Sequence, residues 1–111
     1  MAILTSHTLN GADGTHAGNI TVTLRNLITG ETILKSKMET GGRLSEQIDA
    51  SIIDQNATYE LVFDTASYWV ERNTKATVEQ IALRFGMPDR EGSYHMPVIL
   101  NPNSYSMWCS A

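Results

Sequence analysis

The chain has 111 residues, a formal net charge of -4 at pH 7 and one cysteine, which predicts a single domain over residues 1–111 with no internal disulfide. Its eight lysines and arginines form no basic run, and no segment approaches the ~20 apolar residues of a membrane span, so nucleic-acid and membrane partners are both excluded. Because a lone thiol requires no oxidising compartment, we expect a cytoplasmic protein.

In chain order, alternating apolar and polar residues predict a series of short β-strands separated by turn residues. The predicted strands cover residues 2–9, 19–27, 32–38, 59–64, 77–87, 94–100 and 104–110. Residues 46–58 are polar and predict a loop, with room for one further short strand. Residues 65–73 predict the only helix, about two turns long, with Asp64 or Thr65 as its N-cap. This order of elements predicts an all-β fold, an antiparallel β-sandwich with one short helix.

Three polar residues in or beside the predicted strands have side chains that can act on a bound ligand. His7 lies in the first predicted strand, on the same face as Thr5, because side chains alternate along a strand. His95 lies in another strand, and two histidines near their ordinary pKa of about 6.5 can divide the proton transfers of a water attack. Arg43 follows two glycines, is permanently charged and can bind a carboxylate or imide edge through two N–H groups.

Specific sequence motifs occur along the whole chain. Tyr94-His95-Met96-Pro97, near the C-terminus, is the most specific of them. The others are Ile3–Leu9 followed by Gly18–Leu24, Thr40–Leu44, Tyr59–Asp64 followed by a helix with Tyr68, Leu100–Pro102 and Tyr105-Ser106. Taken together and in this order, they resemble the transthyretin-like / 5-hydroxyisourate hydrolase family over nearly the whole chain.

This resemblance implies a transthyretin-like sandwich of two four-stranded sheets with one short helix, assembled as a homotetramer. It implies active sites in a channel at the dimer–dimer interface, which open a small heterocyclic substrate derived from a purine, and it implies no cofactor. The family's catalytic residues match His7, Arg43 and His95. Tyr105 and Ser106 match the family near its C-terminus, and we expect both to contact the substrate.

The chain departs from the family pattern at its C-terminus and in its first loop. The family's hydrolases end in Tyr-Arg-Gly-Ser, whereas this chain ends in Trp108-Cys109-Ser110-Ala111, so a thiol stands where the arginine is expected. In the first loop, Thr15-His16-Ala17 lacks the usual proline, and we expect His16 to be a surface residue. These departures predict a divergent member, which acts on 5-hydroxyisourate or a related cyclic amide or ureide.

Cys109 leaves several interpretations open. It shares a strand face with Tyr105, opposite Trp108, and if that face lines the site the thiol lies near His7 and His95. There it can contact the substrate or act as a thiolate nucleophile on a different small substrate. With the two histidines it can also form a zinc or copper site, although we expect no metal. Otherwise Cys109 is a small hydrophobe. A separate alternative is that loss of the arginine leaves a non-catalytic protein that binds a small ligand.

Overall fold

The computed structural model describes residues 1–109. Within them the chain forms nine β-strands, one 3-10 helix and one α-helix. The strands are β1 (Ala2–Asn10), β2 (Thr21–Asn26), β3 (Thr32–Lys37), β4 (Arg43–Ile48), β5 (Thr58–Asp64), β6 (Gln80–Gly86), β7 (Ser93–His95), β8 (Val98–Leu100) and β9 (Tyr105–Met107). The 3-10 helix η1 spans Ala50–Ile52 between β4 and β5, and the helix α1 spans Ala66–Glu71 after β5.

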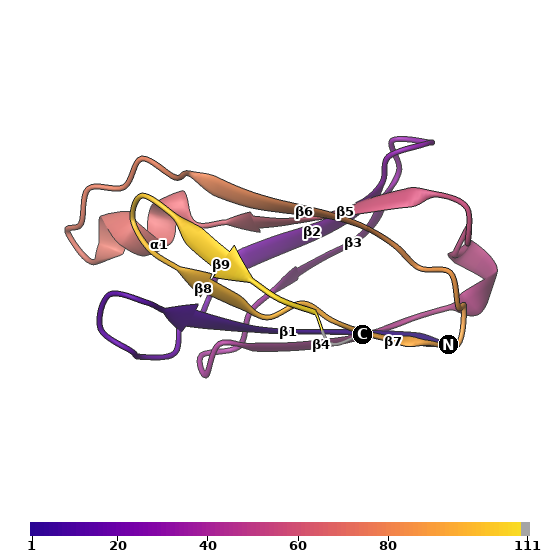
Figure 1. Ribbon diagram of the computed structural model, residues 1–111, viewed down its shortest axis with the longest axis horizontal. Coiled ribbons are helices and arrows are strands. Elements are labelled where there is room, and N and C mark those ends of the chain that lie inside the picture. The colour runs from indigo at the N-terminus through magenta and orange to yellow at the C-terminus, as the bar shows by residue number, and fades with distance from the viewer. Residues whose placement is uncertain (110–111) are drawn as a thin grey trace.

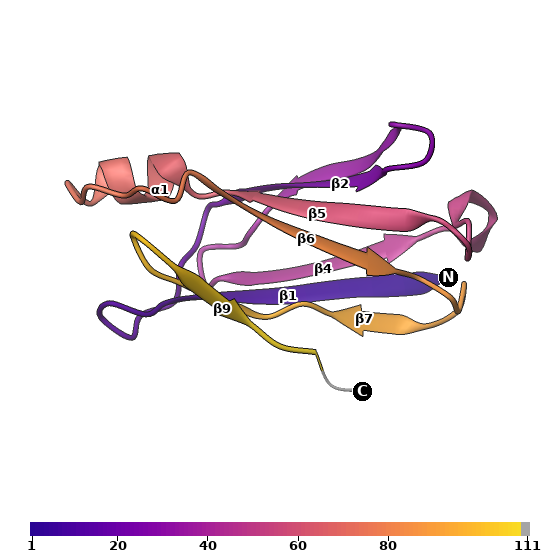
Figure 2. The same cartoon turned by 45° about the horizontal axis from the view of Figure 1, so that its top comes forward.

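The strands form two sheets that pack face to face as a β-sandwich (Figure 1). The five-stranded sheet has the order β4-β1-β8-β9, with the short β7 also paired to β1, and the four-stranded sheet has the order β3-β2-β5-β6. In Figure 1, β6, β5 and β2 lie in the upper layer and α1 lies at one end of the sandwich. Turned by 45°, Figure 2 shows β4, β1 and β7 side by side in the other layer. The all-β sandwich predicted from the sequence is confirmed.

Alternate residues of the strands fill the core between the two sheets. In β5, Tyr59, Leu61 and Phe63 are fully buried, as the alternation of this segment predicts. From the facing sheet, β1 buries Leu4 and the small polar side chain of Thr8. Because strand side chains alternate, burial of one face of β1 leaves its other residues on the outside of the sandwich.

The five-stranded sheet corrects the expected arrangement of two four-stranded sheets. The predicted strand over residues 94–100 is divided into β7 and β8 at Met96-Pro97. Pro97 has no N–H and cannot continue a ladder of hydrogen bonds. Met96 instead donates its N–H to the Thr5 carbonyl at 2.8 Å, and its own carbonyl accepts a hydrogen bond from the Ser6 hydroxyl at 2.7 Å. The chain thereby passes from pairing with the start of β1 to pairing with its end.

The polar segment after the two glycines is a longer strand than the sequence predicted. β4 extends to Ile48 because it pairs antiparallel with β1 from Ala2 to His7. Only Leu44 and Ile48 of this strand reach the core, so its other residues are polar and hide the alternation. The predicted loop therefore begins after Ile48, and the first three residues of the segment belong to β4, where the sequence left room for one short strand.

Three smaller points concern the helix and the ends of the predicted elements. Thr65 is the N-cap of α1, but its buried hydroxyl has no hydrogen-bond partner within residues 1–109, so the predicted side-chain cap is wrong. The last strand, β9, ends at Met107, and the predicted end at Ser110 lies outside the described residues. In residues 1–109 we find no helix with the length and apolar character needed to cross a membrane.

Candidate active site

The outward surface of the five-stranded sheet carries the predicted site residues. Leu4, Ser6 and Thr8 of β1 are buried, so Thr5 and His7 project to the opposite side. Residues paired directly with these positions project to the same side, because opposed side chains share one face of a sheet. We call this surface the outer face, and it comprises Ile3, Thr5, His7, Leu9, His16, Arg43, His95, Ile99 and Ser106.

Arg43 stands directly opposite His7 in the register of β1 and β4. A tight turn leads into it: Gly42 donates its N–H to the Glu39 carbonyl, and Glu39 donates to the Arg43 carbonyl, both at 2.8 Å. Gly42 has a φ of 74°, and a Cβ at this position would lie 2.5 Å from the Thr8 carbonyl oxygen, so glycine is required. The Arg43 side chain is exposed and forms no salt bridge within the described residues, which leaves its charge free to act on a ligand.

His95 reaches the same face from β7. It pairs with Thr5 in the parallel register of β1 and β7. Its Nδ1 atom shares a hydrogen bond of 2.8 Å with the Thr5 hydroxyl. This bond orients the ring and leaves Nε2 as the nitrogen that can exchange a proton with a ligand. The two histidines and Arg43, far apart in the sequence, therefore come to one face on three adjacent strands.

His16 is the residue of this face that the sequence did not reveal. It is exposed, as predicted, but its Nδ1 atom lies 2.9 Å from Nε2 of His7. The two rings are stacked, with centroids 5.0 Å apart and an interplanar angle of 26°. A bridge between His16 and Leu9 brings the loop back against β1. The sequence did contain one signal for this placement: residues 10–14 are rich in turn-forming residues, and a tight turn there brings residue 16 back beside residue 9.

The surroundings of His7 favour its neutral form. Burial is the largest cause that lowers its pKa from the ordinary value, and Arg43, His16 and His95 lower it further in that order. Burial disfavours the charged imidazolium, and so does a second positive charge beside the Arg43 guanidinium. His7 is therefore neutral at pH 7 and able to accept a proton.

The C-terminal strand presents Ser106 to the outer face. Ser106 pairs with Ile99 in the antiparallel register of β8 and β9. Ile99 in turn pairs with Leu9 in the parallel register of β1 and β8. Since Leu9 is on the same side of β1 as His7, this chain of pairs gives Ser106 the same orientation. Ser106 is exposed and has an unblocked hydroxyl within the described residues.

Tyr105 of β9 and Cys109, two residues beyond the end of β9, were expected to contact the substrate, and the single chain does not place them on the outer face. Tyr105 pairs with Leu100, whose side chain is buried in the core. The exposed Cys109 thiol lies 3.5 Å from Sδ of the buried Met96. For Tyr105 the register of β8 and β9 decides this outcome, because a shift of one residue would exchange the two faces. In the described chain, neither Tyr105 nor Cys109 therefore lies beside the histidines of the outer face.

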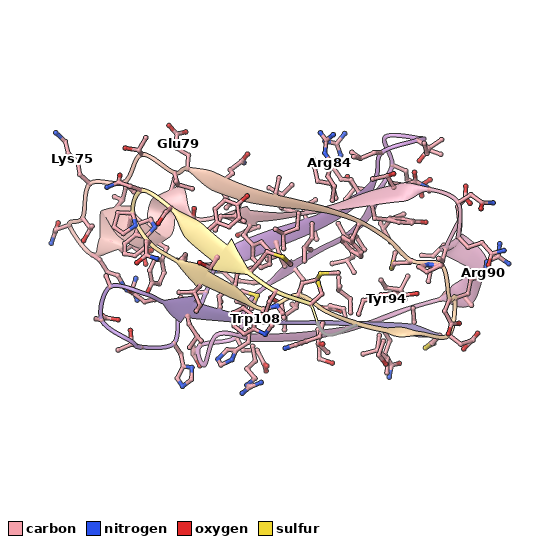
Figure 3. All side chains as sticks on the ribbon, in the orientation of Figure 1. Lys75, Glu79, Arg84, Arg90, Tyr94 and Trp108 are labelled. Carbon is pink, nitrogen blue, oxygen red and sulfur yellow. The ribbon has the colours of Figure 1, made fainter. Side chains whose placement is uncertain are left out.

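Two further points concern the C-terminal segment. The Trp108 side chain is 49% exposed in the single chain, so it does not pack in the core. Figure 3 draws it over the layer that contains β1, on the side of the molecule away from Arg84. Among residues 1–109, no group of three or more histidine, cysteine, aspartate or glutamate side chains could hold a metal ion. The zinc or copper interpretation of Cys109 therefore has no support.

Comparison with known proteins decides the family. Residues 4–109 match the HIUase/Transthyretin family. The chain belongs to this family. It is 32% identical over 115 residues to a 5-hydroxyisourate hydrolase of Deinococcus radiodurans, covering 95% of this chain and 92% of the relative. It is also 32% identical over 111 residues to 5-hydroxyisourate hydrolase 2 of Rhizobium meliloti, with coverage of 95% and 92%. The resemblance drawn from the sequence motifs is confirmed.

A solved structure has the same fold. The structure of Klebsiella pneumoniae 5-hydroxyisourate hydrolase superimposes with a TM-score of 0.84 at 22% sequence identity, over 100% of both chains. A second, described as (S)-allantoin synthase, gives a TM-score of 0.81 at 22% identity and covers 99% of this chain but 44% of the other. The transthyretin-like sandwich predicted for this HIUase/Transthyretin family member is therefore confirmed.

The outer face of this family member offers three chemical functions on one surface. His7 supplies a neutral imidazole, His95 a second imidazole oriented by Thr5, and Arg43 a fixed positive charge. Within residues 1–109 the single chain has no pocket around them. The three groups thus lie on an open sheet surface.

Proposed function

We propose that this protein opens the ring of a small cyclic amide or ureide by adding water, with 5-hydroxyisourate or a close chemical relative as substrate. The observation that carries the proposal is the meeting of His7, Arg43 and His95 on one outer face. The two relatives that are 32% identical are both named as 5-hydroxyisourate hydrolases, which supports this substrate class. Histidine-assisted attack by water requires no cofactor.

His7 is the proposed base, because burial and its charged neighbours lower its pKa and keep the imidazole neutral. It takes a proton from water as the oxygen forms a bond to the ring carbonyl carbon. The carbon–nitrogen bond of the ring then breaks, and its electron pair stays on the nitrogen. His95, in its imidazolium form, donates the Nε2 proton to that nitrogen and becomes a neutral imidazole, since its Nδ1 is engaged with Thr5. Proton exchange with solvent returns both histidines to their starting forms.

Arg43 is the proposed partner of the oxygen that becomes anionic when water adds. A hydrogen bond to a charged group contributes about 1.5–3 kcal/mol, and loss of one donor to an oxyanion lowers kcat by on the order of 10²–10³. Ser106 shares the orientation of this face and is the proposed polar contact to the substrate. The Cys109 thiol has no role in the proposed reaction, because it contacts the buried Met96.

The proposed assembly is a homotetramer with each active site at the dimer–dimer interface, where a second copy covers the outer face. In the single chain the site is open to water. A second copy over the outer face would exclude that water, and exclusion of water strengthens every electrostatic contact in a site. Two exposed apolar side chains also support this assembly: Ile3, 37% exposed on the outer face, and Trp108, 49% exposed. The cytoplasm remains the expected compartment, since a lone thiol requires no oxidising environment.

Ring opening of freshly generated 5-hydroxyisourate, followed by ultraviolet absorbance, tests the proposal. We expect catalytic amounts of the protein to accelerate the decay, and Arg43→Gln to lose on the order of 10²–10³ in kcat. Arg25→Gln is the matched control, because Arg25 is exposed on β2 of the other sheet. A panel of other cyclic ureides and amides is measured in parallel. No acceleration with any of these compounds would refute the proposed hydrolysis.

A further inference from the structure

The loop between β1 and β2 contributes a histidine to the site that no sequence motif assigns. Nδ1 of His16 and Nε2 of His7 are 2.9 Å apart, the length of a hydrogen bond between nitrogen atoms. Their rings are stacked at 26° with centroids 5.0 Å apart. This contact occupies the Nε2 atom of the residue proposed as the base, so the state of His16 bears directly on the chemistry of His7.

The backbone holds His16 firmly on both sides. Before it, Asn10 donates its N–H to the Thr15 carbonyl at 2.8 Å. After it, Ala17 donates its N–H to the Thr8 carbonyl at 2.9 Å and accepts a hydrogen bond from the Thr8 hydroxyl at 2.6 Å. Ala17 is fully buried. His16 is therefore attached to β1 at both neighbouring residues, and its approach to His7 is built into the fold.

The β-bridge gives the His16 side chain its direction. His16 bridges Leu9 in the antiparallel sense, so the two side chains project to one side of the sheet. Leu9 is two residues from His7 and shares its face. The histidine of the loop therefore stands diagonally across from His7 on the outer face, where it can reach the base without any rearrangement of the loop.

We infer that His16 is the positioning residue of His7: it accepts the Nε2–H of His7 through Nδ1 and so holds the base in the tautomer whose Nδ1 lone pair is free. This inference rests on the proposed hydrolysis. Within residues 1–109, Nδ1 of His7 has no hydrogen-bond partner, so it is the nitrogen left to receive the proton of water. His16 itself neither gains nor loses a proton in this step.

The proton balance of the step is simple. The O–H bond of water breaks, its proton passes to Nδ1 of His7, and the oxygen electron pair forms the bond to the ring carbonyl carbon. His7 becomes an imidazolium with two N–H groups, of which Nε2–H remains bound to the neutral ring of His16. A charge-assisted hydrogen bond of this kind is stronger than a neutral one, so the contact stabilises His7 most when it carries the proton.

The same contact resists protonation of both rings together. If His7 and His16 were both cationic, two N–H donors would face each other across 2.9 Å. The titratable and charged groups that act on His7 come from three elements: Arg43 from β4, His95 from β7, and His16 from the loop. Burial lowers the pKa of His7 most, and these three groups follow in the order Arg43, His16 and His95. When cationic, His16 favours a neutral His7; when neutral, it favours a protonated His7 through the hydrogen bond. A variant that keeps the acceptor but cannot titrate separates these two effects.

The experiment compares His16→Ala with His16→Asn. In asparagine the amide oxygen is bonded to Cγ, as Nδ1 is in histidine, so it can accept the same hydrogen bond but cannot titrate. Nitrogen-15 NMR of the imidazole rings, recorded against pH without substrate, reports the tautomer and the pKa of His7. The rate of ring opening is measured on the same proteins.

We expect wild-type His7 to carry its proton on Nε2, and His16→Ala to lose this preference and to lower kcat/KM by about 3–10-fold. His16→Asn restores the tautomer and most of the rate. His16→Asn raises the pKa of His7, because it keeps the hydrogen-bond acceptor and removes a titratable neighbour. An unchanged His7 tautomer in His16→Ala would overturn the inference. These spectra decide it even if the wild-type protein opens no ring, an outcome that would refute the proposed hydrolysis instead.

Discussion

Gly42 tests the link between backbone geometry and the outer face, because replacing it with alanine perturbs two strands at once. Gly42 has a φ of 74°. An added Cβ would lie 2.5 Å from the Thr8 carbonyl oxygen and 3.2 Å from the N and O atoms of Ala17. These contacts are to backbone atoms of β1 and of the loop, which cannot rotate away. Gly42→Ala must therefore move the turn away from β1.

The expected loss of stability has two sources. A left-handed backbone conformation costs an alanine about 1–2 kcal/mol. Moving the turn also weakens the 2.8 Å hydrogen bond from the Thr8 N–H to the Gly42 carbonyl, at a cost of about 0.5–1.5 kcal/mol. Together they lower the free energy of unfolding by about 2–3 kcal/mol. For a chain of this size, that corresponds to a fall in Tm of about 10 °C.

Two other glycines separate these sources. Gly30 has a φ of 76° but nothing within 4 Å of an added Cβ, so Gly30→Ala tests the strain alone. Gly41 has neither a positive φ nor a close neighbour, so Gly41→Ala should change stability by less than about 0.5 kcal/mol. Thermal and urea unfolding are compared at one protein concentration, because assembly shifts apparent stability. If Gly42→Ala is no less stable than Gly30→Ala, the close approach to Thr8 is not what the geometry implies.

Three further predictions concern the outer face and the C-terminal segment. Burial and then Arg43 lower the pKa of His7. Arg43→Gln should therefore raise that pKa and move the acidic limb of the kcat/KM profile to higher pH, whereas Arg43→Lys, which keeps the charge, should not. If the acidic limb moves in neither variant, His7 is not the titrating base. Cys109→Ser should keep the rate of ring opening within about 2-fold of the wild-type rate, because the thiol contacts a buried methionine. A larger loss would show that the thiol takes part in the reaction. Thr5→Val should lower kcat about 3–10-fold by freeing the ring of His95, with Thr5→Ser as the control that keeps the hydroxyl; equal rates in both variants would dismiss this bond as an orienting contact.

The two sheets could be predicted where a strand has one apolar and one polar face. In β5, the alternation of Tyr59, Leu61 and Phe63 predicted which side chains are buried. The sequence left room for a short strand near β4 but did not give its start at Arg43, because only Leu44 and Ile48 of its six residues reach the core. What holds β4 in place is the ladder to β1, which depends on backbone groups of a distant segment and leaves little trace in the local sequence.

The site was predictable in its residues more than in their arrangement. The sequence motifs predicted three site residues, His7, Arg43 and His95. Their position on one face depends on the strand registers that pair β1 with β4 and β7. The face expected for Cys109 was wrong, because strand alternation says which residues share a side but not which side faces the core. His16 was overlooked because its position follows from hydrogen bonds between the loop and β1 rather than from any motif.

The central claim is that histidines of the outer face perform acid–base chemistry on a cyclic amide or ureide. The most direct measurement is the initial rate of 5-hydroxyisourate ring opening with wild-type protein and with the double variant His7→Asn, His95→Asn. We predict that catalytic amounts of wild-type protein accelerate the reaction and that the double variant returns it to the spontaneous rate with its fold intact. A double variant as fast as the wild type would contradict the account.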